Sequence, residues 1–243
     1  HLLEGKICII VDNSPTVLLL PATLFDHTQT LEDYRQPPIP GTYINLLRLA
    51  SILISLFLPA LWLLFAYDPG WLPEILQIIG PREVGQIPLG IQFILASVGI
   101  DLIRIASIQT PSSLATSLGL IGALMLGEFS VKVGLFAPEV ILYMAIAAIS
   151  SFTIPGFEFS LTLKLFRLFL IIAVILFQEI GLIVGSVVVF LIFALSKSFG
   201  TPYLWPLIPF NWQALKTYFI RQSTLSLNNR RSNVHQLEDE TRK

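Results

Sequence analysis

The stretch FILASVGIDLIRIASIQTP, residues Phe93 to Pro111, decides the class of fold, because it is apolar enough to cross a membrane and yet carries charges. Around it, the 243-residue chain has 54% hydrophobic and 13% charged residues, whereas a soluble domain carries about 25% charged residues. We therefore expect a mostly α-helical, polytopic membrane protein in contact with membrane lipid. The net charge of −1 provides no basic surface for nucleic acid, so no nucleic-acid partner is expected.

Apolar runs follow one another from Ile44 onward, separated by turn residues. A membrane helix needs about 20 residues. This length selects six candidate spans, at 44–67, 87–108, 113–132, 138–154, 158–178 and 181–197. With both ends of the membrane domain in the cytosol, most Lys and Arg residues fall on the inner side, as the positive-inside rule requires. We expect about six membrane helices.

Residues 1–43 resemble the edge of a soluble domain. Two short aliphatic runs, GKICIIVD and TVLLLPATLFD, flank the turn formers Asn13-Ser14-Pro15, and this pattern predicts a β-hairpin. The polar segment that follows predicts a hinge into the membrane, because its prolines, Pro37, Pro38 and Pro40, end helices. The first residues lack the pattern of a signal peptide, and we expect the chain to be the C-terminal part of a longer protein.

The helical membrane domain is expected at 44–210 and a tail at 211–243. The tail carries six Lys or Arg residues against three acids, and few aliphatic residues after Leu227. This composition predicts a flexible, basic, cytosolic segment near anionic lipid headgroups.

The second apolar run carries a polar stripe. Ser97, Asp101 and Arg104 share one helix face at the i, i+4, i+7 spacing. A charge at mid-bilayer costs roughly 2.5 to 3.5 kcal/mol on insertion scales, so Asp101 should face protein or water, whereas Arg104 is close enough to the inner interface to snorkel. The stripe is explained either by an intrahelical ion pair or interfacial helix without further role, or by the lining of a hydrated ion path.

The third apolar run carries a ridge of small residues every four positions: Ala115, Gly119, Ala123 and Gly127. Such a ridge lets another helix approach closely, either within the chain or between subunits. We interpret it as a helix-packing surface.

Two further groups of charges accompany the spans. Glu128 and Lys132, four residues apart, form either an interfacial ion pair of little energetic value or part of a charged ring at a pore mouth, in which case Glu128 belongs to the ion path. In the fifth run, Ser160, Lys164 and Arg167 share a face. We interpret these cations as inner-end anchors, with a gating contact as the alternative.

Motifs of catalysis and metal binding are lacking in the sequence. There is no Gly-rich phosphate loop, HExxH or GxSxG pattern, Cys8 is the single cysteine, and the three histidines are far apart in sequence. We expect no enzyme, no cofactor and no metal site.

Two motifs carry a family resemblance. Near the start the chain reads Val11-Asp12-Asn13-Ser14-Pro15-Thr16-Val17, then Leu20-Pro21-Ala22-Thr23-Leu24-Phe25-Asp26 and Glu32-Asp33-Tyr34; near the end it reads Lys197-Ser198-Phe199-Gly200-Thr201-Pro202-Tyr203-Leu204, with Pro206 and Pro209-Phe210 after it. These residues resemble the spore germination receptor A-subunit family, the GerA family, over about residues 4–212. Within it, 134–143 and 63–65 are most similar to the stage V sporulation protein AF branch.

The resemblance implies a multi-pass subunit in the inner membrane of a bacterial endospore, with other germination membrane proteins as partners. It further implies a pentamer-like homo-oligomer that conducts ions, in which five copies of the Asp101 stripe would ring a pore. In the AF branch the implied role is to assist or amplify germination. Nutrient recognition belongs to a separate B subunit, so no germinant pocket is implied. The chain departs from the family in lacking most of the N-terminal domain and in having Phe157-Glu158 where Tyr is frequent before Glu.

Two other classes remain open from the sequence. A secondary transporter would place paired polar residues in broken helices, usually within an inverted repeat, and the chain shows no internal repeat although its helices contain proline breaks. A membrane scaffold would use the small-residue ridge without needing Asp101.

Overall fold

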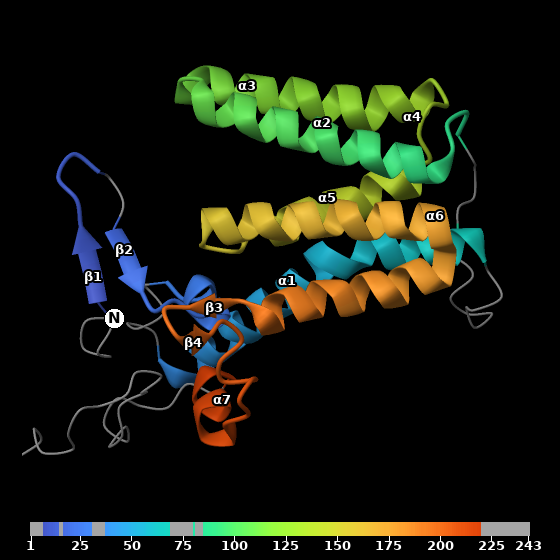
Figure 1. Ribbon diagram of the computed structural model, residues 1–243. Coiled ribbons are helices and arrows are strands. Elements are labelled where there is room, and N and C mark those ends of the chain that lie inside the picture. The colour runs from blue at the N-terminus through green and yellow to red at the C-terminus, as the bar shows by residue number, and fades with distance from the viewer. Residues whose placement is uncertain (1–6, 15–16, 31–36, 69–79, 81–84, 220–243) are drawn as a thin grey trace, which may run out of the picture. The chain divides into compact units, whose positions relative to one another are not determined.

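The computed structural model describes residues 7–14, 17–30, 37–68, 80 and 85–219 (Figure 1). The described residues form two compact units: one contains those up to Leu49 and from Val188 onward, and the other contains Ala50–Val187. The first unit is here called the terminal unit and the second the membrane unit.

The expected hairpin is present at the start of the terminal unit. Strand β1 (Ile7–Ile10) pairs antiparallel with β2 (Val17–Leu20), with Ile7 opposite Leu20 and Ile10 opposite Val17. Asn13 adopts a left-handed conformation with φ of 61° in the connecting turn, which asparagine tolerates better than most residues. The β-hairpin predicted from the turn residues is therefore confirmed.

Helix α1 (Pro38–Tyr67) begins earlier than the proline pattern predicts. The expected hinge at Pro38 and Pro40 is instead the first turn of the helix. Proline is tolerated there because the first N–H groups of a helix have no intrahelical acceptor in any case. The prolines therefore begin the helix rather than end it.

Helix α2 (Leu89–Gln109) is packed between its neighbours in the membrane unit. Phe93 is fully buried against Trp62 of α1, with ring centroids 5.5 Å apart, and Trp62 lies 5.2 Å from Tyr143 of α5 (Pro138–Phe152). A Cβ added at Gly90 would lie 2.5 Å from Ile175 of helix α6, which comprises Phe157–Leu195. These contacts determine the position of α2 along its axis relative to α1 and α6.

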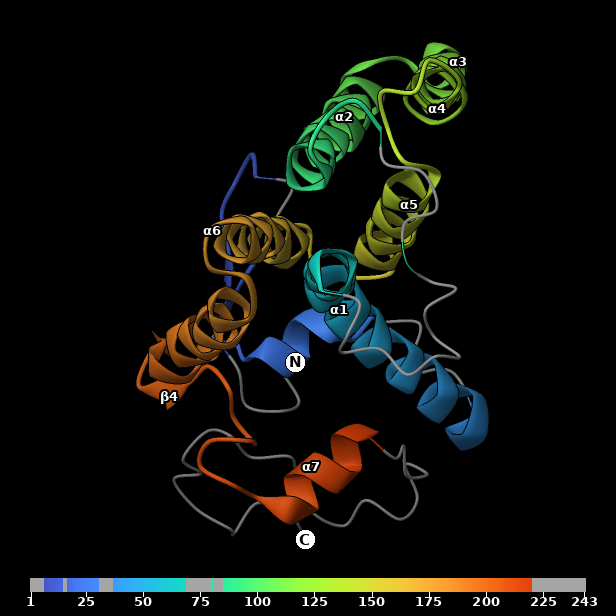
Figure 2. The ribbon, with the colours of Figure 1, turned by 90° about the vertical axis from the view of Figure 1, so that its right-hand side faces the viewer.

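Helix α3 (Ser112–Ala123) runs beside α2, as Figures 1 and 2 both show. It continues through a π-helical segment η6 (Leu124–Phe129) into the short α4 (Ser130–Lys132). A Cβ added at Gly122 would lie 2.6 Å from Ile103, and one added at Gly99 would lie 2.6 Å from Leu126. The two helices therefore approach through small residues on both sides.

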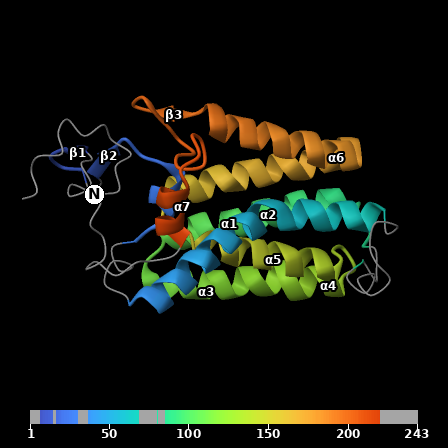
Figure 3. The same cartoon turned by 90° about the horizontal axis from the view of Figure 1, so that it is seen from below.

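Helix α6 (Phe157–Leu195) folds back on itself. Gln178 has φ of 48° and ψ of −121°, which interrupts the helix, and the ribbon reverses direction there (Figures 1 and 3). A Cβ added at Gly185 would lie 2.9 Å from Leu170 and 3.5 Å from Ala173. In a straight helix the 15 residues from Leu170 to Gly185 would span about 22 Å, so the segment consists of two antiparallel arms.

Four helices of the described residues are long and apolar enough to cross a membrane: Pro38–Tyr67, Leu89–Gln109, Leu114–Lys132 and Phe157–Leu195. Pro138–Phe152 is apolar but shorter. The expected number of six spans is not confirmed. The predicted fifth and sixth runs, 158–178 and 181–197, correspond to the two arms of α6, and the predicted fourth run corresponds to the short α5.

The core of the terminal unit joins its N-terminal and C-terminal parts. Phe25, in the 3₁₀ helix η2 (Leu24–Thr28), packs with Trp205, Leu215 and Tyr218, and all four side chains are buried. The last two belong to α7 (Trp212–Phe219). The start of the predicted flexible tail is therefore a helix, because its apolar residues recur three positions apart and meet Phe25; residues 220–243 lie outside the described part of the chain.

Candidate functional site

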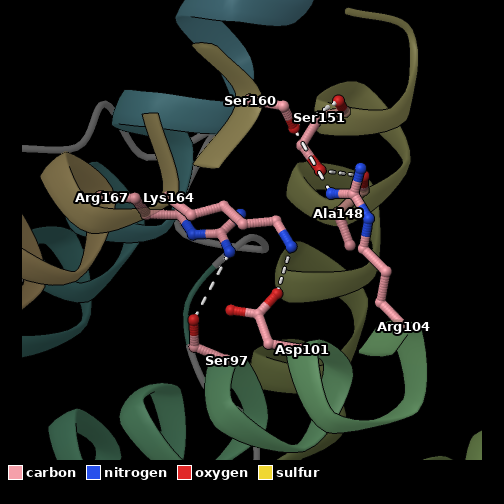
Figure 4. A network of polar contacts seen from close by, with 8 residues as sticks. All are labelled: Ser97, Asp101, Arg104, Ala148, Ser151, Ser160, Lys164 and Arg167. Atoms are coloured by element: carbon pink, nitrogen blue, oxygen red, sulfur yellow. Dashed lines mark hydrogen bonds and ion pairs between the residues drawn. The ribbon is translucent and has the colours of Figure 1, made fainter. Parts of the chain in front are cut away.

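Asp101 forms an ion pair with a different helix from its own. Its Oδ1 accepts a hydrogen bond from Nζ of Lys164, in the first arm of α6 (Figure 4). The Lys164 side chain is 6% exposed, whereas that of Asp101 is 34% exposed. The structure thus pairs the carboxylate with Lys164 in place of the i, i+3 pair with Arg104 considered from the sequence.

Arg104 turns away from Asp101 along α2 and interacts with the turn between α5 and α6. Its guanidinium carbon lies 4.8 Å from the ring centroid of Phe152 and 5.3 Å from that of Phe157, within the range of cation–π attraction. Its Nη1 donates weakly to Oγ of Ser160 at 3.4 Å. Ser160 in turn donates to the carbonyl of Ser151 at 3.1 Å.

Arg167 is fully buried, with 0% exposure. Its Nη2 donates to Oγ of Ser97 at 3.4 Å, a distance at which a hydrogen bond is weak. Its Nε and Nη1 are buried and have no hydrogen-bond partner. The residue predicted as an inner-end anchor therefore lies inside the helix packing.

These side chains form one polar cluster between α2, α5 and the first arm of α6, all within the membrane unit (Figure 4). We call it the polar cluster; its residues are Ser97, Asp101, Arg104, Ser151, Ser160, Lys164 and Arg167. It contains three cations and one carboxylate. Both arginines are close enough to Lys164 to repel its charge.

The cluster lies deep in a helix that is long enough to span the membrane. The first arm of α6, from Phe157 to the interruption at Gln178, measures about 30 Å, which equals the hydrocarbon thickness of a bilayer. At 1.5 Å per residue, Lys164 lies about 10 Å and Arg167 about 15 Å from Phe157. Arg167 is therefore at the middle of its arm.

The sequence stripe Ser97, Asp101 and Arg104 is one wall of this cluster, and the partners from α6 were not predicted. A signal for them existed, because Ser160, Lys164 and Arg167 repeat the same i, i+4, i+7 stripe on the facing helix. Polar stripes on two apolar helices of one membrane domain are expected to pack against each other, because lipid provides no hydrogen-bonding partner for either stripe.

The small-residue ridge of α3 faces away from the contact with α2. A Cβ added at Gly119 or Gly127 would meet nothing within 4 Å. Ala123 is exposed and Ala115 is half-buried. Gly122, which the ridge does not include, makes the close approach to Ile103. The ridge remains a prediction of helix packing that the contacts among the described residues do not use.

Glu128 and Lys132 form the expected i, i+4 ion pair, with 2.5 Å between Oε1 and Nζ. Their side chains are 51% and 66% exposed. The pair belongs to η6 and α4 and is separate from the polar cluster.

Gln92 was not singled out from the sequence, although it is fully buried and holds two loops together. Its Nε2 donates to the carbonyl of Ile87 at 2.6 Å, and its Oε1 accepts from the N–H of Ala137 at 2.8 Å. A glutamine one turn into an apolar helix is the signal that could have identified it, because an amide at that depth needs partners.

The two family motifs meet in the terminal unit. The N–H of Leu24 donates to the carbonyl of Tyr203 at 2.9 Å, and the N–H of Ala22 donates to Oγ of Ser198 at 3.1 Å. Asp26 caps η2 by accepting from the N–H and hydroxyl of Thr23 at 2.7 and 2.8 Å. The motifs are therefore parts of one packed structure.

The remaining motif residues lie in turns or at their edges. Asp12, Asn13 and Ser14 form the exposed turn of the first hairpin, and Pro15 lies outside the described residues. Pro21 follows β2 and is half-buried. Strand β3 (Lys197–Ser198) pairs with β4 (Thr201–Pro202), and Gly200 between them has φ of 85°, which glycine adopts without strain.

Tyr203 has an altered acidity. Burial, together with the nearby charge of Asp26, raises the pKa of Tyr203 to about 12. Its ring lies 6.1 Å from that of Phe193 and 6.0 Å from that of His27. The phenol is therefore held neutral within the junction of the two motifs.

No group of three or more His, Cys, Asp or Glu residues suited to a metal ion occurs in the part of the chain that the structure describes.

The family model for the Bacillus/Clostridium GerA spore germination protein matches residues 1–233. Stage V sporulation protein AF of Bacillus subtilis (strain 168) is 47% identical over 236 residues, which cover 97% of this chain and 48% of that protein. From the same organism, spore germination protein KA is 32% identical over 91% of this chain and 41% of its own length, and spore germination protein B1 is 32% identical over 94% and 48%.

The chain spans about half the length of these relatives. No solved structure matches it. The resemblance to the AF branch agrees with the identity of 47% to the relative of that name. The match of the family model over nearly the whole sequence shows that the chain belongs to the GerA family of spore germination proteins.

Proposed function

We propose that this chain is a membrane subunit of a spore germination complex in the inner membrane of the spore, and that it assists germination by conducting ions as a homo-oligomer. The similarity to relatives named as sporulation and spore germination proteins supports the role in spore germination. The apolar helices support the membrane location. Other germination membrane proteins and the surrounding lipid are its partners, and it has no catalytic role.

The observation that carries the ion-conduction proposal is the exposure of Asp101. Its carboxylate is bound on one side by the buried Lys164, while 34% of the side chain stays accessible at a helix position about 18 Å from Leu89. A charged group at that depth is costly when it faces lipid. A carboxylate that is fixed by a buried cation and still accessible is suited to lining a hydrated path.

The test is single-channel conductance of the full-length protein in a planar bilayer, comparing wild type with Asp101→Asn. Glu158→Gln is the matched control, because it removes one negative charge at an exposed position outside the polar cluster. We expect discrete openings in wild type, a changed unit conductance in Asp101→Asn and an unchanged one in Glu158→Gln. Each protein is compared only after its oligomer is shown to be intact. Glu128→Gln tests the outer position in the same assay.

Silence of the wild type, with a folded oligomer verified, would overturn the proposal. A flux of a specific solute without channel openings would then identify a secondary transporter. Germination that proceeds normally with Asp101→Leu would identify a scaffold that needs only helix packing.

A further inference from the structure

Arg167 is a buried cation whose hydrogen-bonding capacity is largely unused. A guanidinium carries five N–H donors. Its Nε and both hydrogens of Nη1 have no acceptor, and Nη2 reaches only Oγ of Ser97 at 3.4 Å. The side chain is 0% exposed, so bulk water does not supply the missing acceptors. Leaving a charge in this state is strongly unfavourable.

The other cations of the polar cluster are compensated. Lys164 forms an ion pair with Asp101, and Arg104 lies over the rings of Phe152 and Phe157. Arg167 is attracted by the carboxylate of Asp101, which Lys164 already binds, but the described contacts give it neither an ion pair of its own nor an aromatic face. Lys164 and Arg167 together carry two positive charges against one carboxylate, so one positive charge and three N–H donors remain for an acceptor group of negative charge.

We propose that Arg167, with the neighbouring hydroxyl of Ser97, binds a small oxyanion in the polar cluster. Oxygen acceptors of a carboxylate or phosphate match the donors of a guanidinium and form short, charge-assisted hydrogen bonds with it. Figure 4 shows the Arg167 guanidinium and the Lys164 ammonium directed to the same side, toward Ser97 and Asp101 on α2. A bound anion there would join the first arm of α6 to α2.

The depth of the site favours a free anion over a lipid headgroup as the source of the oxygens. Arg167 is about 15 Å from the start of an arm that is long enough to span the hydrocarbon core of a bilayer, whereas a lipid phosphate stays at the interface. The same chemistry supplied by a lipid would require a headgroup drawn in between the helices. This inference concerns binding and does not depend on conduction.

The experiment measures the thermal unfolding of the purified full-length protein in nanodiscs of zwitterionic lipid, with inorganic phosphate titrated against chloride at constant ionic strength. We expect the wild-type Tm to rise by about 5 to 10 °C at a phosphate concentration about 100-fold above Kd. Phosphate also stabilises folded proteins in general, so the variants decide. Arg167→Gln should lose most of the rise, and Lys132→Gln, which removes an exposed cation, should keep it.

Arg167→Lys keeps the positive charge but has fewer N–H donors, and it replaces Arg167→Gln in the experiment if that variant does not fold. We expect phosphate to raise the Tm of Arg167→Lys less than that of wild type. A second arm replaces phosphate by nanodiscs that contain an anionic phospholipid. A rise there that depends on Arg167, without free phosphate, would assign the oxyanion to a lipid headgroup. An equal rise in all variants, or none in either arm, would overturn the proposal.

Discussion

The polar cluster predicts an unequal response to the loss of each partner of its ion pair. Asp101→Asn keeps the shape of the side chain and leaves three cations without a carboxylate. Removing one partner of a fully buried pair costs about 3 to 5 kcal/mol. Since Asp101 is 34% exposed, solvent screening reduces the cost of removing its charge. We therefore expect Asp101→Asn to lower the free energy of unfolding by about 2 to 3 kcal/mol.

Lys164→Met removes the cation and keeps most of the side-chain volume. Asp101 then still has a cation to neutralise it, because Arg167 interacts with it electrostatically. The removed ammonium also no longer repels the two arginines. We therefore expect a loss of only about 0 to 1.5 kcal/mol, so that Asp101→Asn is the more harmful change by about 1 to 2 kcal/mol.

The assay is equilibrium unfolding of the full-length protein in detergent, followed by tryptophan fluorescence. The double variant Asp101→Asn, Lys164→Met gives the coupling energy between the two positions. Lys132→Met, in the exposed pair with Glu128, is the control and should change stability by less than about 0.5 kcal/mol. If Lys164→Met costs as much as Asp101→Asn or more, the charge balance derived for the cluster is incorrect.

Two further predictions concern other parts of the chain. Gly122→Leu should destabilise the membrane unit by about 1 to 3 kcal/mol, because the added side chain overpacks against Ile103. Gly119→Leu, with open space around it, should leave the stability of the monomer nearly unchanged. Thermal unfolding compares the two variants, and equal losses of stability would contradict the contact between α2 and α3. Between pH 10 and pH 12 the unfolded chain has released the Tyr203 proton and the folded chain has kept it, so the stability of the fold that is present below pH 10 decreases as the pH rises. When solvent screening of the partly exposed phenol is included, wild type should lose about 1 to 2 kcal/mol more of its free energy of unfolding than Tyr203→Phe. Equilibrium unfolding as a function of pH measures this difference.

Local signals in the sequence predicted the elements well and their partners poorly. The turn Asn13-Ser14 predicted the first hairpin, and apolar length located the helices, because both depend on neighbouring residues. Pro38 was misinterpreted because a proline favours the start of a helix as readily as it ends one.

The charges show the limit of such reasoning most clearly. Lys164 and Arg167 look like interfacial anchors when their helix is considered alone, and only the packing of α6 against α2 buries them. The pairing of Asp101 required knowledge of which helix faces it. The packing partner of the ridge at Gly119, within the chain or in another subunit, and the homo-oligomer remain predictions.

The packing of Phe25 has a consequence for the order in which the protein can fold during synthesis. Its core partners Trp205, Leu215 and Tyr218 are about 180 to 190 residues downstream. At about 5 to 20 residues per second, the ribosome produces them about 10 to 40 s after Phe25. The N-terminal segment must therefore wait, with an uncovered aromatic side chain, until the intervening membrane helices have been made. Closure of this core is a late event in biogenesis, because it cannot be complete before α7 has been made and has packed against Phe25.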